Sequence, residues 1–221
     1  MGDTNLKTAL FEQLARVGKA LANGKRLELL DLLAQAERTV DALAVAAGLN
    51  LTTASAHLQT LKQAGLVATR RDGTRIFYRI AGPDVLDLLV RAREIAAARL
   101  PDVRSARDAY FGDGPDIAVL DHAELARRMS SDEVTLVDVR PELEYAAGHL
   151  PGAVNIPVEQ LEARLDEVPV DREVVAYCRG PYCVFAHEGV KVLQAHGRRA
   201  ARLTDGVTEW RLAGLPVSTT A

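Results

Sequence analysis

The chain has 221 residues, of which 48% are hydrophobic and 26% are charged. These proportions are ordinary for soluble globular protein and argue against general disorder. The length suits one large domain or two small ones. No apolar stretch is long enough to span a membrane, and the first residues lack the apolar core of a secretion signal, so we expect a cytoplasmic protein.

The charge is unevenly distributed along the chain. Residues 1–100 carry a net charge of +4, whereas residues 101–221 carry a net charge of −7. Such a division suggests two domains with different partners.

The first hundred residues show the periodicity of helices. Apolar residues recur every three or four positions over residues 6–21, and further helical segments are expected at 27–33, 40–49 and 51–64. Residues 66–80 read as a β-hairpin around Asp72-Gly73, and a long helix is expected over 84–100. We therefore predict a mainly helical domain over residues 1–100.

A change of pattern follows. Residues 101–116 contain two prolines and two glycines and are assigned to a linker region, whose start can continue the preceding helix. In residues 117–221, buried-strand runs at 134–140, 174–178 and 202–203 alternate with helical stretches at 122–129, 159–165 and 184–197. This alternation predicts an α/β domain with a central parallel sheet.

Two short helices followed by a basic hairpin predict a winged helix-turn-helix. The second of these helices presents polar side chains suited to base edges in a major groove, and the hairpin presents cations suited to phosphates. The candidate DNA-binding residues are Thr52, Thr53, Ser55, His57, Gln59 and Lys62 on the helix, and Arg70, Arg71 and Arg75 on the hairpin. The alternative is a helical module with a solvated basic hairpin.

Three segments carry a family resemblance: LANGKRLELLDLL, TTASAHLQTLKQAGLV and RRDGTRIFYRI. Through them, residues 5–100 resemble an ArsR-type winged-helix repressor. The resemblance implies a homodimer, joined by the first and last helices of the domain, that binds a palindromic operator in double-stranded DNA. Family members that sense metals usually place cysteines in this domain, but residues 1–177 contain none, so an inducer must be sensed elsewhere in the chain or by another route.

The cysteines lie in the second half, at positions 178 and 183. Cys178 follows an apolar run and precedes a helix, and a strand-to-helix turn favours the nucleophilic thiolate. Arg179 adds a positive charge beside it. The alternative is a buried, inert cysteine.

Three further segments resemble a single rhodanese domain over residues 117–217: DVRPELEYAAGHLPGAVNIP, YCRGPYC and DGVTEWRLAGLPV. The resemblance implies that Cys178 accepts sulfane sulfur as a persulfide and passes it to a thiol acceptor, without a cofactor. It also implies that Asp138 and Arg140 help to order the active-site loop. His149 is expected to be a hydrogen-bonded structural residue, and Trp210 a core residue.

The loop departs from the rhodanese pattern. Many active members carry an Arg or Lys late in the loop, where this chain has Tyr182 and Cys183, and this argues against efficient thiosulfate turnover. Cys183 is a candidate resolving thiol for Cys178, although linear spacing does not establish disulfide geometry. A metal site with His187 is an alternative that lacks a fourth ligand, and we expect no metal.

Taken together, these features predict a DNA-binding transcriptional regulator, and we expect a repressor. Its second domain is expected to sense or carry reactive sulfur through Cys178. Three alternatives remain at this point. One is an active rhodanese-type sulfurtransferase with separately regulated DNA binding, so that enzymatic turnover is left open. Another is a thiol-dependent metal or metalloid sensor. In the third, the second domain is an inherited binding module for a protein or a small anion.

Overall fold

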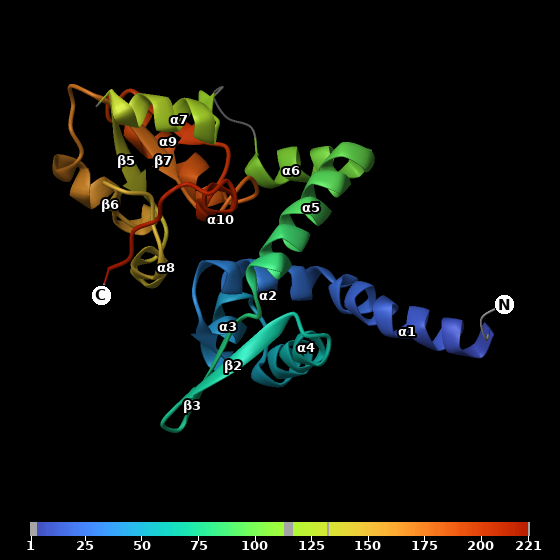
Figure 1. Ribbon diagram of the computed structural model, residues 1–221. Helices are drawn as coiled ribbons and strands as arrows, with labels where there is room; N and C mark the ends of the chain where they lie inside the picture. Colours follow the sequence, from blue (N-terminus) through green and yellow to red (C-terminus); the bar gives the residue numbers. More distant parts are fainter. Residues whose placement is uncertain (1–3, 113–116, 132, 221) are drawn as a thin grey trace. The chain divides into compact units, whose positions relative to one another are not determined.

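The computed structural model describes residues 4–112, 117–131 and 133–220. The chain divides into two compact units, Met1–Leu89 and Val90–Ala221 (Figure 1). Within the described residues, every helix is too short or too polar to cross a membrane.

The first unit is a winged helix-turn-helix. Its helices are α1 (Thr4–Leu21), α2 (Gly24–Gln35), α3 (Val40–Ala46), α4 (Leu51–Gln63) and the first part of α5 (Pro83–Arg99). Its strands are β1 (Arg38–Thr39), β2 (Val67–Asp72) and β3 (Arg75–Ile80), which form an antiparallel sheet in the order β1-β3-β2. The predicted helices and hairpin are thereby confirmed.

Local chemistry sets the start of α4. The Asn50 side chain accepts a hydrogen bond from the Thr53 N–H at 2.8 Å and so caps the helix. Gly48 has a φ of 60°, a left-handed conformation that glycine adopts easily, and it allows the tight turn after α3. Leu58 and Leu61 are fully buried, so the opposite, polar face of α4 points to solvent.

The wing is the β2–β3 hairpin, which extends away from the helices (Figure 1). Its register pairs Val67 with Ile80 at the base and Asp72 with Arg75 at the tip. Gly73 lies between the strands with a φ of 58°, as the Asp72-Gly73 signal predicts. The two-residue strand β1 was not predicted, because two residues are too few to show a period.

The second unit is an α/β domain. Its strands are β4 (Val119–Leu120), β5 (Val134–Asp138), β6 (Val154–Asn155), β7 (Glu173–Tyr177) and β8 (Ala200–Leu203), and they pair in parallel in the order β4-β8-β7-β5-β6. Its helices include α6 (Pro101–Phe111), α7 (His122–Ser130), α8 (Glu142–Ala147), α9 (Val184–Ala195) and α10 (Val207–Leu212). The predicted parallel sheet is confirmed.

Both faces of this sheet are buried, which explains the unbroken apolar run in β7. Val175 and Tyr177 pack on one face in a cluster with Trp210 of α10. Val174 and Ala176 point to the other face, toward the cluster that includes buried residues of α9. Because side chains alternate along a strand, Cys178 follows Val174 and Ala176 onto the α9 face.

Three segments differ from or extend the predicted pattern. Residues 159–165 form parts of two 3₁₀ helices, η1 (Val158–Gln160) and η2 (Glu162–Glu167), and not an α-helix. Pro157 precedes this segment, and Arg164 has a non-helical φ of −117° that interrupts it. Residues 101–111, at the start of the expected linker region, form α6 with Pro101 in its first turn, and residues 113–116 of that region lie outside the described residues.

Candidate functional site

The two cysteines lie at the ends of one short loop, Cys178–Cys183, which we call the cysteine loop. It joins β7 to α9, so Cys178 sits at the carboxyl end of a central strand and Cys183 immediately precedes the helix. The two residues form a disulfide with their Cα atoms 6.3 Å apart. Cys178 is only 2% exposed, and the Cys183 N–H donates to the Gly180 carbonyl at 3.1 Å, which tightens the turn.

Arg179 is the loop's cation, and its guanidinium is engaged by Glu144 of α8. Arg179 Nη2 lies 2.7 Å from Glu144 Oε1, and Nε lies 2.9 Å from Oε2, a two-pronged ion pair. Glu144 is fully buried, and the Arg179 guanidinium also lies 5.1 Å from the centre of the Phe185 ring. The positive charge beside Cys178 is therefore already balanced by a carboxylate.

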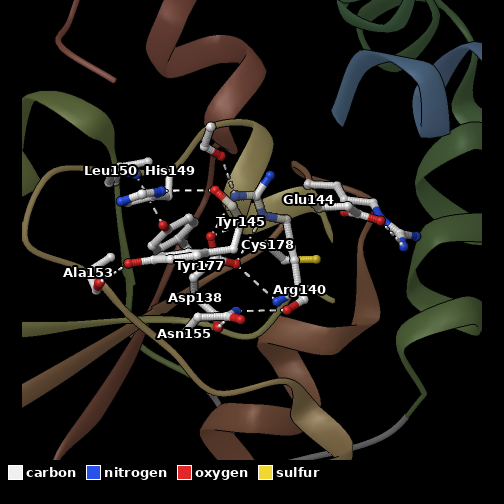
Figure 2. A network of polar contacts seen from close by, with 12 residues as sticks. Asp138, Arg140, Glu144, Tyr145, His149, Leu150, Ala153, Asn155, Tyr177 and Cys178 are labelled. Atoms are coloured by element: carbon white, nitrogen blue, oxygen red, sulfur yellow. Dashed lines mark hydrogen bonds and ion pairs between the residues drawn. The ribbon is translucent and has the colours of Figure 1, made fainter. Parts of the chain in front are cut away.

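A buried ion pair lies at the end of β5, next to the cysteine loop (Figure 2). Asp138 and Arg140 are both completely buried, and Asp138 Oδ1 accepts from Arg140 Nε at 2.9 Å and from the Arg140 N–H at 3.0 Å. Arg140 Nη2 also donates to the Gly148 carbonyl at 2.7 Å. Burial lowers the pKa of Arg140, but the Asp138 carboxylate outweighs it, so the net shift of that pKa is upward.

Further hydrogen bonds connect this pair to neighbouring segments (Figure 2). The Asn155 amide donates to the carbonyl oxygens of Asp138 and Arg140 at 3.0 and 2.9 Å. The Leu150 N–H donates to the Tyr177 hydroxyl at 3.1 Å, and burial raises the pKa of that hydroxyl. Tyr177 precedes Cys178, so the network fixes the strand end from which the cysteine loop departs.

The two residues with predicted structural roles behave accordingly. His149 is 7% exposed, its Nδ1 lies 2.9 Å from the Tyr145 carbonyl oxygen, and its ring stacks on that of Tyr145. Trp210 is 2% exposed and donates its indole N–H to the Pro216 carbonyl at 2.8 Å.

The segment that begins α10 packs directly against the cysteine loop. A Cβ placed on Gly206 would lie 2.1 Å from the Arg179 carbonyl oxygen and 2.5 Å from the Gly180 nitrogen. Glu209 Oε2 accepts from the Gly206 N–H at 3.0 Å. Burial raises the pKa of Glu209, although hydrogen bonds to backbone N–H groups and the charge of Arg93 oppose that shift.

The cysteines and His187 do not form a metal cluster. Both thiols are joined in the disulfide, and no three His, Cys, Asp or Glu side chains of the described residues are grouped so as to hold an ion. The His187 ring contacts the Phe111 ring at 5.4 Å. Burial, together with Lys191 and Arg202, lowers the pKa of His187.

The candidate DNA-binding residues of the helix lie on the outer face of α4 or at its edges. Thr52, Gln59 and Lys62 are exposed, whereas Thr53, Ser55 and His57 are half-buried. The Gln59 amide donates to the Tyr78 hydroxyl at 3.2 Å, and Lys62 Nζ donates to the Thr69 hydroxyl at 3.1 Å. These bonds connect the helix to the wing.

The three candidate arginines of the wing are all exposed, but they differ in surroundings. Arg70 forms an ion pair with Glu37 and lies 4.9 Å from the centre of the Phe77 ring. Arg71 Nε donates to the Gly73 carbonyl at 3.0 Å, and Arg75 lies at the tip of the hairpin. Arg70 is thus held against the body of the domain.

Two residues beside the cysteine loop, Glu144 and Glu209, were not predicted from the sequence to belong to the site. Glu144 lies in a six-residue helix that has no strong periodic signal, and Glu209 lies between the motif residues Gly206 and Trp210. Neither carboxylate differs in the sequence from an ordinary surface glutamate. Only the fold shows that Glu144 is buried, and Glu209 largely so, beside the cysteine loop.

A winged helix-turn-helix joined to a rhodanese-type α/β unit defines a class of two-domain regulator, and comparison with known proteins agrees. Residues 23–69 match the model of bacterial regulatory proteins of the arsR family, and residues 121–213 match the rhodanese-like domain. The HTH-type transcriptional regulator Rv0324 of Mycobacterium tuberculosis is 56% identical over 216 residues, which cover 98% of this chain and 95% of that protein. The chain belongs to the ArsR-family transcriptional regulators that carry a rhodanese-like domain.

Each half also has relatives of its own. A protein of Allochromatium vinosum named sulfurtransferase is 33% identical over 99 residues, 44% of this chain and 92% of that protein. A solution structure of a homodimeric winged helix-turn-helix DNA-binding domain from Mycobacterium bovis is 58% identical, with a TM-score of 0.42, and covers 46% of this chain and 94% of that one.

Removal of the Asp138 carboxylate should be strongly destabilising. Asp138→Ala leaves the Arg140 guanidinium buried without its charge partner, so we expect a loss of about 3–5 kcal/mol in the free energy of unfolding. Urea denaturation measures this loss. Glu12→Ala is the control, because it breaks an exposed ion pair with Lys19 and should leave the unfolding midpoint nearly unchanged. Equal midpoints for the two variants would contradict the assigned importance of the buried pair.

Substitution of Gly206 should disturb the cysteine loop. Gly206→Ala places a methyl group against the Arg179–Gly180 peptide, and we expect a cost of about 1–3 kcal/mol and faster alkylation of the reduced cysteines. Gly18→Ala is the matched control, because nothing lies within 4 Å of its added Cβ. Thermal denaturation and timed alkylation read out the two effects. An alkylation rate unchanged by Gly206→Ala would show that the contact does not constrain the loop.

Proposed function

We propose that this chain is a homodimeric repressor that binds operator DNA and responds to reactive sulfur through Cys178, with Cys183 as the resolving thiol. The observation that carries the sulfur proposal is the placement of both cysteines on one loop, within disulfide distance, at the buried end of β7.

The DNA-binding half of the proposal rests on exposure and charge. One face of α4 is buried through Ala54, Leu58 and Leu61, while the polar residues Thr52, Gln59 and Lys62 are exposed, as a recognition helix requires. The wing carries exposed Arg71 and Arg75, which suit phosphates or a narrow minor groove. Arg70, which is held by Glu37, would position the wing more than it contacts DNA.

The homodimer is supported by an uncovered apolar surface. On α1, four large apolar side chains lie on the solvent side with exposures of 57–70%, and they recur at three-to-four spacing: Leu6, Leu10, Phe11 and Leu14. A helix face of this kind is buried when a second copy packs against it. The Mycobacterium bovis domain, which is similar to this half, is described as homodimeric.

The proposed sulfur chemistry has two steps, one at each cysteine. The Cys178 thiolate attacks the sulfane sulfur of a persulfide or polysulfide, the donor's S–S bond breaks, and the donor leaves as a thiolate or hydrosulfide. The Cys183 thiolate then attacks Cys178 Sγ, the bond to the added sulfur breaks, and hydrosulfide leaves. The two thiols are oxidised to the disulfide, the sulfane sulfur is reduced, and two molecules of external thiol reverse the change.

Catalytic sulfur transfer is the second candidate function. It is favoured by similarity to the Allochromatium vinosum protein named sulfurtransferase. One observation argues against repeated turnover of an anionic donor such as thiosulfate. The Arg179 guanidinium, which could bind such a donor, already forms an ion pair with Glu144. The resolving position of Cys183 also favours a single oxidation event over repeated transfer.

Substitutions on the DNA-binding side should separate two kinds of contact. Arg75→Ala should weaken operator binding and lower the slope of log affinity against log salt concentration by about one unit, because a phosphate contact is lost. His57→Ala should reduce the preference for operator over random DNA more than it reduces non-specific affinity. Fluorescence anisotropy across a salt series measures both. Unchanged slope and preference in the two variants would remove these assignments.

Polysulfide should change the operator affinity of the wild type by about fivefold or more, and dithiothreitol should reverse the change. Cys178→Ser should not respond, because a serine hydroxyl cannot hold sulfane sulfur, and Cys183→Ser should load sulfur on Cys178 yet respond weakly. Fluorescence anisotropy measures the change in operator affinity, and mass spectrometry measures the sulfur loaded on Cys178. An identical response in wild type and Cys178→Ser would end the sensor proposal, and sulfur transfer without a DNA response would favour the enzyme.

A further inference from the structure

Glu209 of α10 is a largely buried carboxylate that has no role in the proposed sulfur chemistry. Its side chain is 13% exposed, and its Oε2 accepts from the Gly206 N–H at 3.0 Å. A Cβ placed on Gly180 would lie 3.3 Å from Oε2 and 3.4 Å from Oε1. Both carboxylate oxygens therefore rest against the middle of the cysteine loop.

Gly206, which is hydrogen-bonded to Glu209, packs against the same part of the loop. Because its backbone lies so near the Arg179–Gly180 peptide that a methyl group does not fit, the peptide, Gly206 and the Glu209 carboxylate form one packed group. Closing or opening the bond between Cys178 and Cys183 changes the freedom of the peptide between them. A shift of that peptide toward α10 displaces Gly206 or the carboxylate, and a shift away from α10 loosens the contact.

Arg93 is the charged partner of Glu209. Arg93 Nη1 lies 3.6 Å from Glu209 Oε1, and the Arg93 side chain is 24% exposed, so solvent screens this pair less than a surface pair. Arg93 belongs to the part of α5 that lies in the second unit. The same 17-residue helix begins in the first unit, where Val85 and Leu89 belong to the winged-helix core.

We propose that Glu209 is a positioning residue of the cysteine loop, and that its ion pair with Arg93 transmits the state of the Cys178–Cys183 pair to α5. This inference rests on the proposed function and names the route of its regulation. The winged-helix domain contains no cysteine, so it needs such a route to respond to thiol chemistry. α5 is suited to that role because it is continuous from the winged-helix core to Arg93. Linkage then requires that operator binding also alter the redox equilibrium of the loop.

The first measurement is the operator affinity of the full chain in its reduced and disulfide forms. We expect a ratio of dissociation constants of about five or more for the wild type. Glu209→Gln keeps an oxygen for the Gly206 N–H but loses the charge, so its ratio should fall toward one. Arg93→Gln should do the same, the double variant should fall no further, and Arg93→Lys should retain most of the ratio.

Glu94→Gln is the matched control. It removes a carboxylate from the same helix, but that carboxylate is exposed and forms its ion pair with Arg91. It should keep the wild-type ratio. A wild-type ratio retained by Glu209→Gln would overturn the inference while leaving the proposed function intact.

The second measurement needs no DNA. It therefore tests the positioning role of Glu209 separately from the proposed DNA response. The redox equilibrium of Cys178–Cys183 against dithiothreitol is followed by alkylation and mass spectrometry for the same variants. Glu209→Gln and Arg93→Gln should shift it in the same direction, and Glu94→Gln should not. If the wild type shows no DNA response, the proposed function fails, and an equilibrium unchanged in all variants overturns the positioning role as well.

Discussion

The buried pair of Asp138 and Arg140 is the interaction on which the cysteine-loop end of the second unit depends. A guanidinium with no exposure to water is tolerated only when charge and hydrogen bonds replace its solvent, and here a carboxylate and the Gly148 carbonyl do so. Because Asn155 in turn holds the carbonyl oxygens of both residues, the ends of β5 and β6 are fixed together. The cysteine loop leaves the neighbouring strand at this rigid edge.

The same principle of internal charge balance recurs around the loop. Glu144 is fully buried and Glu209 nearly so, and each faces an arginine, Arg179 in one case and Arg93 in the other. One of these ion pairs joins the loop's own arginine to α8, and the other lies beside the middle of the loop. Their arrangement fixes the path of the loop backbone, because a paired charge in a dry setting resists displacement more than an exposed one.

Much of this architecture could be predicted from the sequence, and the rest could not, for physical reasons. The helical period over residues 51–64 predicted α4, Asp72-Gly73 predicted the wing, and the apolar run before Cys178 predicted a buried strand. The disulfide, by contrast, depends on how a turn brings two Cα atoms together, which linear spacing leaves open. Burial of Glu144 and Glu209 depends on tertiary packing, and a glutamate within a short helix carries no local sign of it.

The pairing of Cys178 with Cys183 has a chemical consequence for the durability of the protein. A thiolate that meets peroxide passes through sulfenic acid, and exposed cysteines continue to sulfinic and sulfonic acids, the last of which cells do not repair. Cys183 lies within bonding distance of Cys178, so a sulfenic acid formed on Cys178 in the reduced protein would condense with the neighbouring thiol to give the disulfide. A cysteine pair of this kind stops oxidation at the disulfide, a stage that external thiols can reverse.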